Sequence, residues 1–205
     1  MRKRHILIIS ILALGMQFAF PQNAGDHYIA EAATIPTVNP VIAKEDVKAE
    51  EKCRYCDGLA AYIRSVNETV TGEEAAKMVS CMIEQAKRYQ LDEKLLMAVA
   101  QTESCYDSEA VSSTDYKGLM QTSDDLAAEA GYSSEDLFRP EISIQIGADY
   151  MKRQMENFDD DTVLALTAYN QGPGSVYEGA YDLFYAEQTM EHLKTLESFL
   201  RERGF

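Results

Sequence analysis

The sequence has few basic residues. It contains 19 Lys and Arg against 34 Asp and Glu, which gives a formal net charge of -15 at pH 7. Nucleic acids bind basic surfaces, so this charge balance argues against a nucleic-acid partner. The acidity is instead typical of a surface that keeps an exported domain soluble.

Other features are scarce or missing as well. There are only three His residues and no cluster of potential metal ligands, so we expect no metal and no cofactor. No segment alternates apolar and polar residues for the length of a useful strand, and no internal repeat marks a second module. The sequence therefore predicts an all-α fold with a single core.

The N-terminus has the pattern of an export signal. Basic residues at positions 2–4 precede an apolar run over residues 6–20 that is short for a membrane span. We expect residues 1–24 to form a signal peptide, with an uncleaved signal anchor as the alternative. No Cys lies near the end of the run, which argues against a lipoprotein anchor.

The rest of the chain divides by composition. Residues 25–52 contain Pro36 and Pro40 and lack a helical or strand period, so we expect a linker there. Residues 53–76 form a predicted N-terminal helical extension, and residues 77–205 form the main domain with a C-terminal helix. One core is sufficient for a domain of this length.

The four cysteines are Cys53, Cys56, Cys81 and Cys105. An even number of cysteines in an exported chain favours two disulfides. We favour bonds from Cys53 and Cys56 to Cys81 and Cys105, with the connectivity left open. A redox pair at Cys53 and Cys56 is disfavoured because no strand precedes the motif.

Local signals predict where the helices begin. Thr71 and Glu74 form a capping box for a helix that runs to about Tyr89, and Asp92 caps the next helix, which ends after Ser104. The other expected helices are 57–67, 124–130 capped by Ser123 and ended by Gly131, a long helix from Pro140, 161–170, and about 189–201.

Glu103 interrupts an apolar stripe. Leu96, Val99, Ala100 and Glu103 recur at helical spacing, so the carboxyl group completes the face that points to the core. Burial and the negative C-terminal end of the helix both disfavour its ionised form, and both raise its pKa. A carboxyl group that stays protonated near neutral pH is suited to act as a general acid in glycosidic cleavage.

An ordered set of short motifs follows Glu103. The motifs are Ala110-Val111-Ser112, Gly118-Leu119-Met120-Gln121, Gly147-Ala148-Asp149-Tyr150, and Ala168-Tyr169-Asn170 followed by Gly172-Pro173-Gly174. The set covers the region from about Met78 to Val176 and resembles the catalytic domain of the soluble lytic transglycosylases, lysozyme-like bacterial enzymes that cut peptidoglycan.

The resemblance implies a fold, a substrate and a set of roles. It implies a lysozyme-like helical fold with a short hairpin between Ser112 and Gly118, peptidoglycan glycan strands as substrate, and Glu103 as the catalytic acid. Ser112 is expected to hydrogen-bond the acid, and the Tyr150 hydroxyl to point at it. The remaining substrate contacts that it implies are Gly118, Met120, Gln121, Tyr169 and Asn170.

Two other functions stay open. Asp115-Tyr116 and Thr122-Ser123 depart from the family pattern, which leaves the shape of the groove undecided. A hydrolytic muramidase would use Asp115 or Asp107 as a second carboxylate. A non-catalytic glycan-binding scaffold of a secretion, conjugation or spore apparatus would keep only the fold.

Overall fold

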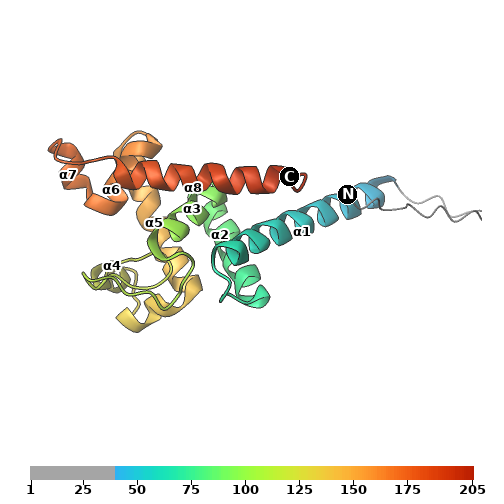
Figure 1. The fold of residues 1–205 in the computed structure, drawn as a ribbon, viewed down its shortest axis with the longest axis horizontal. Coiled ribbons are helices and arrows are strands. Elements are labelled where there is room, and N and C mark those ends of the chain that lie inside the picture. The colour runs from blue at the N-terminus through green and yellow to red at the C-terminus, as the bar shows by residue number, and fades with distance from the viewer. Residues whose placement is uncertain (1–39) are drawn as a thin grey trace, which may run out of the picture. The chain divides into compact units, whose positions relative to one another are not determined.

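The computed structural model describes residues 40–205, with side chains from residue 49, and its regular elements are helices (Figure 1). No strand occurs in this part of the chain, which confirms the all-α prediction. The expected hairpin is reduced to two isolated bridges, Val111 to Lys117 and Lys117 to Thr122. The helices are α1 Pro40–Val66, α2 Gly72–Tyr89, α3 Glu93–Ser104, α4 Asp124–Glu129, η1 Ser134–Phe138, α5 Pro140–Asn157, α6 Thr162–Gln171, α7 Pro173–Tyr177 and α8 Phe184–Arg201.

Residues 1–39 lie outside the described part of the chain. The expected signal peptide or anchor at residues 1–24 and the first half of the expected linker fall there. Among the described residues, no helix is long and apolar enough to cross a membrane.

The predicted helix starts are confirmed by their caps. The amide of Glu74 donates to Thr71 Oγ1 over 3.2 Å, and the Thr71 amide donates to Glu74 Oε2 over 2.8 Å. Asp92 caps α3 and Asp161 caps α6 through side-chain carboxylates. Ser123 caps α4 with its side chain, and Pro140 is the first residue of α5, both as predicted.

Two helices are longer than predicted. α1 begins at Pro40, so residues 40–52, expected in the linker, are helical. This segment is rich in Glu, Lys and Ala, which favour helix without creating an apolar period. α8 begins at Phe184 rather than near Thr189, and Asp182 Oδ1 accepts a hydrogen bond from the Phe184 amide over 3.0 Å.

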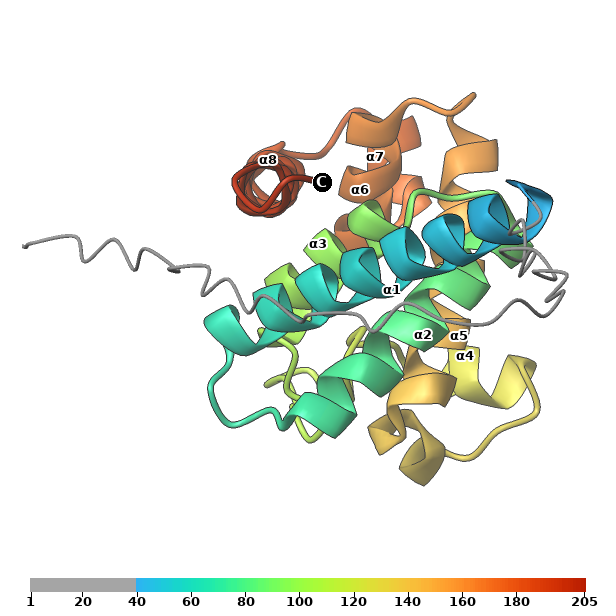
Figure 2. The ribbon, with the colours of Figure 1, turned by 90° about the vertical axis from the view of Figure 1, so that its right-hand side faces the viewer.

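α3 is the central helix of the core. It packs against α2 on one side and α8 on the other, and α1 in turn packs on α2 (Figures 1 and 2). Leu96, Val99 and Ala100, the apolar stripe that leads to Glu103, are fully buried. The stripe prediction is therefore confirmed, and the last turn of α3 is held firmly from both sides.

A second, smaller core lies under α4 and η1. It contains Ala127, Leu137, Ile142 and Ile146. The two isoleucines share one face of α5, and Met151 continues that face into the main core. Leu137 of this small core lies against Gly118 in the loop that carries the motifs between residues 110 and 122.

Gly118 holds that loop close to η1. Its φ is +73°, and a Cβ there would lie 1.9 Å from the carbonyl oxygen of Leu137. The residue is buried, so the structure gives it a packing role, and the expected substrate contact at Gly118 is wrong. The short distance between the two backbones explains why only glycine fits.

Replacing Gly118 with Ala is therefore expected to lower the free energy of unfolding by about 3 kcal/mol or more, because backbone must move to admit the Cβ. Urea denaturation measures this loss. Gly131→Ala is the matched control: its φ is +83° but nothing lies within 4 Å of the added Cβ. An equal loss in both variants would show that the contact with Leu137 does not matter.

All four cysteines are free thiols in the structure, so the two predicted disulfides are absent. Cys53 and Cys56 both lie in α1: Cys53 is exposed, whereas Cys56 packs against the core together with Cys81 of α2. Burial raises the pKa of the Cys56 and Cys81 thiols. Both are thereby kept protonated and weakly nucleophilic.

Candidate active site

Glu103 lies in the last turn of α3, next to the C-cap Cys105. Its half-buried side chain lines a cavity of about 610 Å³ between the end of α3, the end of α6 and the start of α8. The other residues that line this cavity are Thr102, Asn170, Gln171, Asp182, Phe184, Tyr185 and Gln188.

Among the described residues, the carboxyl group of Glu103 has one hydrogen-bond partner, the hydroxyl of Tyr185, which donates to Oε1 over 2.6 Å. Burial raises the pKa of Glu103 from its usual 4.5 to about 7, and the Tyr185 hydrogen bond lowers it in part because it favours the ionised form. The pKa of Glu103 is thus raised as predicted, and burial is the main cause, also as predicted. Glu103 can therefore exchange a proton near neutral pH.

A polar network fixes the first turns of α8 against α3. Thr102 Oγ1 lies 3.0 Å from Thr189 Oγ1 and 3.0 Å from His192 Nδ1. Thr189 in turn donates to the carbonyl oxygen of Tyr185 over 2.9 Å. The relative position of Glu103 and Tyr185 thus depends on contacts that Thr102, in the cavity wall, makes with the next turns of α8.

Asn170 stands between two cavities at the end of α6. Its side chain is exposed and lines both the Glu103 cavity and a second cavity of about 350 Å³. Gln171 also lines both. An extended ligand that fills both cavities would pass Asn170, which agrees with its expected role in binding substrate.

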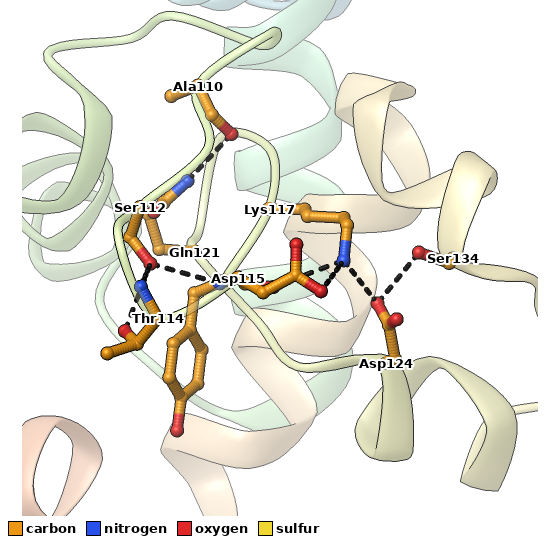
Figure 3. A network of polar contacts seen from close by, with 9 residues as sticks. Ala110, Ser112, Thr114, Asp115, Lys117, Gln121, Asp124 and Ser134 are labelled. Atoms are coloured by element: carbon orange, nitrogen blue, oxygen red, sulfur yellow. Dashed lines mark hydrogen bonds and ion pairs between the residues drawn. The ribbon is translucent and has the colours of Figure 1, made fainter.

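Gln121 lines the second cavity from the motif loop. Its Nε2 donates to the carbonyl oxygen of Ala110 over 3.0 Å (Figure 3). It also donates to the carbonyl oxygen of Gly118 over 2.9 Å. Both amide hydrogens are then in use, and the side chain offers a ligand only the acceptor Oε1. Gln121 has no hydrogen bond to Glu103.

Ser112 does not touch Glu103, so the predicted hydrogen bond between them is wrong for this structure. Ser112 Oγ instead accepts hydrogen bonds from the amides of Tyr116 over 3.0 Å and Thr114 over 3.3 Å. These bonds close the turn of its own loop, a frequent use of a loop serine.

Asp115, in the same loop, is paired with a lysine. Lys117 Nζ lies 2.9 Å from both Asp115 Oδ2 and Asp124 Oδ1, and Ser134 donates to Asp124 over 2.8 Å (Figure 3). This network ties the loop to α4 and η1. Asp107, the other predicted second carboxylate, lines a separate cavity, and neither aspartate lines the one that holds Glu103.

Met120 is fully buried, so its predicted place in the groove wall is wrong. Its side chain lies against Gly147 of α5, where an added Cβ would come within 2.6 Å of Met120 Cβ. Its carbonyl oxygen accepts a hydrogen bond from the Tyr169 hydroxyl over 2.9 Å. Tyr169 therefore uses its hydroxyl inside the protein and presents only part of its ring to the second cavity.

Tyr150 makes no hydrogen bond to the acid. Its ring packs on Tyr169 with 5.2 Å between ring centroids, and it lines the second cavity. The orientation of its hydroxyl toward Glu103 stays a prediction. The tyrosine hydroxyl next to the acid comes from Tyr185, which was not among the predicted site residues because the last helix was expected to begin only near residue 189.

A metal site is not evident in the described part of the chain. Across residues 49–205, no group of three or more His, Cys, Asp or Glu side chains is arranged to hold a metal ion.

Comparison with known proteins places this site in a family. Residues 80–181 match the family described as Transglycosylase SLT domain. Membrane-bound lytic murein transglycosylase C of Edwardsiella ictaluri is 32% identical over 120 aligned residues, and the match covers 51% of this chain and 33% of the relative. Membrane-bound lytic murein transglycosylase F of Alcanivorax borkumensis is 39% identical over 89 residues, 40% of this chain and 19% of the relative.

A solved structure has a similar fold. The 70 kDa soluble lytic transglycosylase of Escherichia coli matches with a TM-score of 0.52 and 21% identity, over 71% of this chain and 28% of that one. The chain spans about a third of the length of the first curated relatives it matches. Through residues 80–181, the chain belongs to the transglycosylase SLT family.

Proposed function

We propose that this chain is a peptidoglycan lytic transglycosylase. It would cleave the β-1,4 bond between N-acetylmuramic acid and N-acetylglucosamine without water and leave a 1,6-anhydro ring. The observation that carries the proposal is Glu103, a half-buried acid with a pKa of about 7, held by Tyr185 in a cavity beside Asn170. The relatives named lytic murein transglycosylases support it.

Glu103 serves twice in this mechanism. Its protonated form gives the proton to the glycosidic oxygen as the bond to C1 breaks, and N-acetylglucosamine leaves. The ionised carboxylate, stabilised by the Tyr185 hydroxyl, then takes the proton of the C6 hydroxyl. The C6 oxygen bonds to C1, and the acid is regenerated without a water molecule.

The positive charge at C1 needs stabilisation between these steps. The oxygen of the 2-acetamido group of the same sugar supplies it, so a second carboxylate is not required. Asn170 is the residue we assign to hold this acetamido group, because its exposed amide lies at the edge of the Glu103 cavity. Gln121 Oε1 and the rings of Tyr150 and Tyr169 would bind the adjoining sugars in the second cavity.

Hydrolysis is the second candidate, and one observation favours it. Asp182 is a second carboxylate in the wall of the Glu103 cavity, although its Oδ1 already accepts a hydrogen bond from the Phe184 amide. A glycosidase with two carboxylates would use it as base or nucleophile. Asp182→Asn would then remove activity, whereas a transglycosylase would keep most of it.

Release of soluble muropeptides from purified peptidoglycan separates an enzyme from a scaffold. The wild-type protein is expected to release them. If it binds peptidoglycan and releases none, the protein is a non-catalytic glycan-binding module.

The substrate lies outside the cytoplasmic membrane, so the proposal includes export. The signal peptide or anchor expected at residues 1–24 would provide it. An association with secretion or conjugation machinery stays a prediction.

Tyr185→Phe tests the contact with the acid. The Tyr185 hydrogen bond lowers the pKa of Glu103, so its loss is expected to raise that pKa further and to move the alkaline fall of activity to higher pH. The pH dependence of kcat/KM measures the shift. Tyr55→Phe is the control, because the Tyr55 hydroxyl donates to Glu93 over 2.7 Å elsewhere. Superimposable profiles for wild type and Tyr185→Phe would contradict the assignment.

A further inference from the structure

We propose that Phe184 and Gln188, on the first two turns of α8, form a sugar-binding subsite in the Glu103 cavity. The ring of Phe184 would stack on the apolar face of an N-acetylhexosamine ring, and the Gln188 amide would hydrogen-bond its polar groups. This inference rests on the proposed function, because it assigns one sugar of the same glycan strand.

Phe184 is an unusually exposed aromatic residue. It is 73% exposed, the highest value among the exposed large hydrophobic side chains of the described part of the chain, and it lines the cavity that contains Glu103. The free energy falls when a ligand covers an apolar ring that is exposed to water. Because Phe184 lines the same cavity as Glu103, we assign the glycan strand as the ligand that covers the ring.

The position of Phe184 relative to the acid is fixed by its neighbours. The Phe184 amide donates to Asp182 Oδ1 over 3.0 Å. The Gln171 side chain holds the Asp182 backbone twice, with Nε2 donating to its carbonyl oxygen over 2.9 Å and Oε1 accepting from its amide over 3.2 Å. The next residue, Tyr185, binds Glu103. The ring is therefore presented by a segment that is tied to α6 and to α3 before substrate arrives, which lowers the entropic cost of binding.

Gln188 complements the ring. It follows Phe184 by four residues, so both lie on one face of α8, and both line the cavity. Its side chain is exposed and makes no hydrogen bond to the described residues, which leaves a donor and an acceptor for a ligand. The cavity wall contains no Lys or Arg. This combination suits an uncharged sugar with an acetamido group better than a carboxylate.

Both residues lie beyond the region that matches the family, which ends at residue 181. The proposed subsite therefore belongs to the C-terminal helix of this chain and not to the shared motifs.

Binding of N-acetylglucosamine oligomers to the Glu103→Gln protein, measured by calorimetry, tests the subsite without turnover. Adding Phe184→Ala is expected to weaken binding about tenfold, from the loss of apolar contact, and Phe184→Trp should restore it. In the active protein, Phe184→Ala should raise KM and leave kcat nearly unchanged. Gln188→Ala should weaken binding as well. The control is Tyr177→Ala, whose ring is 66% exposed but does not line this cavity.

The outcomes for the subsite and for the proposed function can be told apart. If Phe184→Ala and Gln188→Ala bind the oligomers as tightly as their parent while the wild type still produces anhydro sugars, the subsite is wrong and the function stands. If the wild type produces no anhydro sugars but the two variants lose binding, the subsite stands and the reaction is wrong.

Discussion

Glu103→Gln is expected to abolish cleavage of purified peptidoglycan while the fold and the binding of glycan are kept. Glutamine has nearly the same shape, and its Oε1 still accepts the hydrogen bond that Tyr185 donates to Glu103. It has no proton to give to the leaving oxygen and no negative charge with which to take one from C6. Acid-base catalysis commonly contributes about 10²- to 10⁴-fold, and a group that acts in both steps should lie at the upper end.

The same substitution is expected to stabilise the protein at alkaline pH. The pKa of Glu103 is about 7 in the folded protein and 4.5 as its usual value, so between these values the unfolded chain loses a proton that the folded protein keeps. Stability therefore falls as the pH rises from 4.5 to 7. At pH 8 Glu103→Gln should exceed the wild type by about 1 to 3 kcal/mol, and at pH 4 the two should be alike.

Denaturant unfolding of both proteins at the two pH values checks this result, and muropeptide release checks the loss of activity. Glu109→Gln is the control for the charge change, because that carboxylate is exposed in a loop and lies outside the Glu103 cavity. Muropeptide release by Glu103→Gln at the wild-type rate would reject Glu103 as the proton donor in either enzymatic mechanism.

Asn170→Ala is expected to slow cleavage by about 10²- to 10³-fold, the usual effect of removing one polar group that stabilises a transition state. The fold should be unaffected, because the side chain is exposed and makes no hydrogen bond to the described residues. The rate on intact peptidoglycan measures the effect, with a thermal melting curve to verify the fold.

Asn157→Ala provides the matched control for Asn170. Its amide donates to Gln154 Oε1 over 3.3 Å at the end of α5, away from both cavities. Its activity should equal that of the wild type. If Asn170→Ala also cleaves at the wild-type rate, Asn170 does not hold the acetamido group.

The acid and the helix that carries it were predictable from the sequence, because their signals are local. A capping Asp92 and a buried stripe of Leu96, Val99 and Ala100 place Glu103 at the inner face of the last turn of α3. Burial and position in the helix then determine the direction of its pKa without knowledge of its neighbours.

The partners of the acid were not predictable in the same way. Tyr185 reaches Glu103 from 82 residues further along the chain, across the contact between α3 and α8. The N-cap of its helix is Leu183, which makes no side-chain cap hydrogen bond, so no capping residue in the sequence marked the start of α8.

Motif membership was a poor guide to where a side chain points. Met120 and Gly118 belong to the motif loop, yet one is fully buried and the other packs its backbone under η1. Ser112 closes its own turn. Sequence order identified the loop correctly, but only the packing of that loop against α5 and η1 decides which of its side chains face the cavity.

The most direct test of the proposed reaction is cleavage in water enriched in heavy oxygen, followed by mass spectrometry of the released fragments. If Glu103 closes an anhydro ring as proposed, the muramic acid ends formed by the wild-type protein will be one water lighter than free reducing ends and will contain no heavy oxygen. Reducing ends that carry one heavy oxygen, lost in Asp182→Asn, would contradict the proposal and establish hydrolysis.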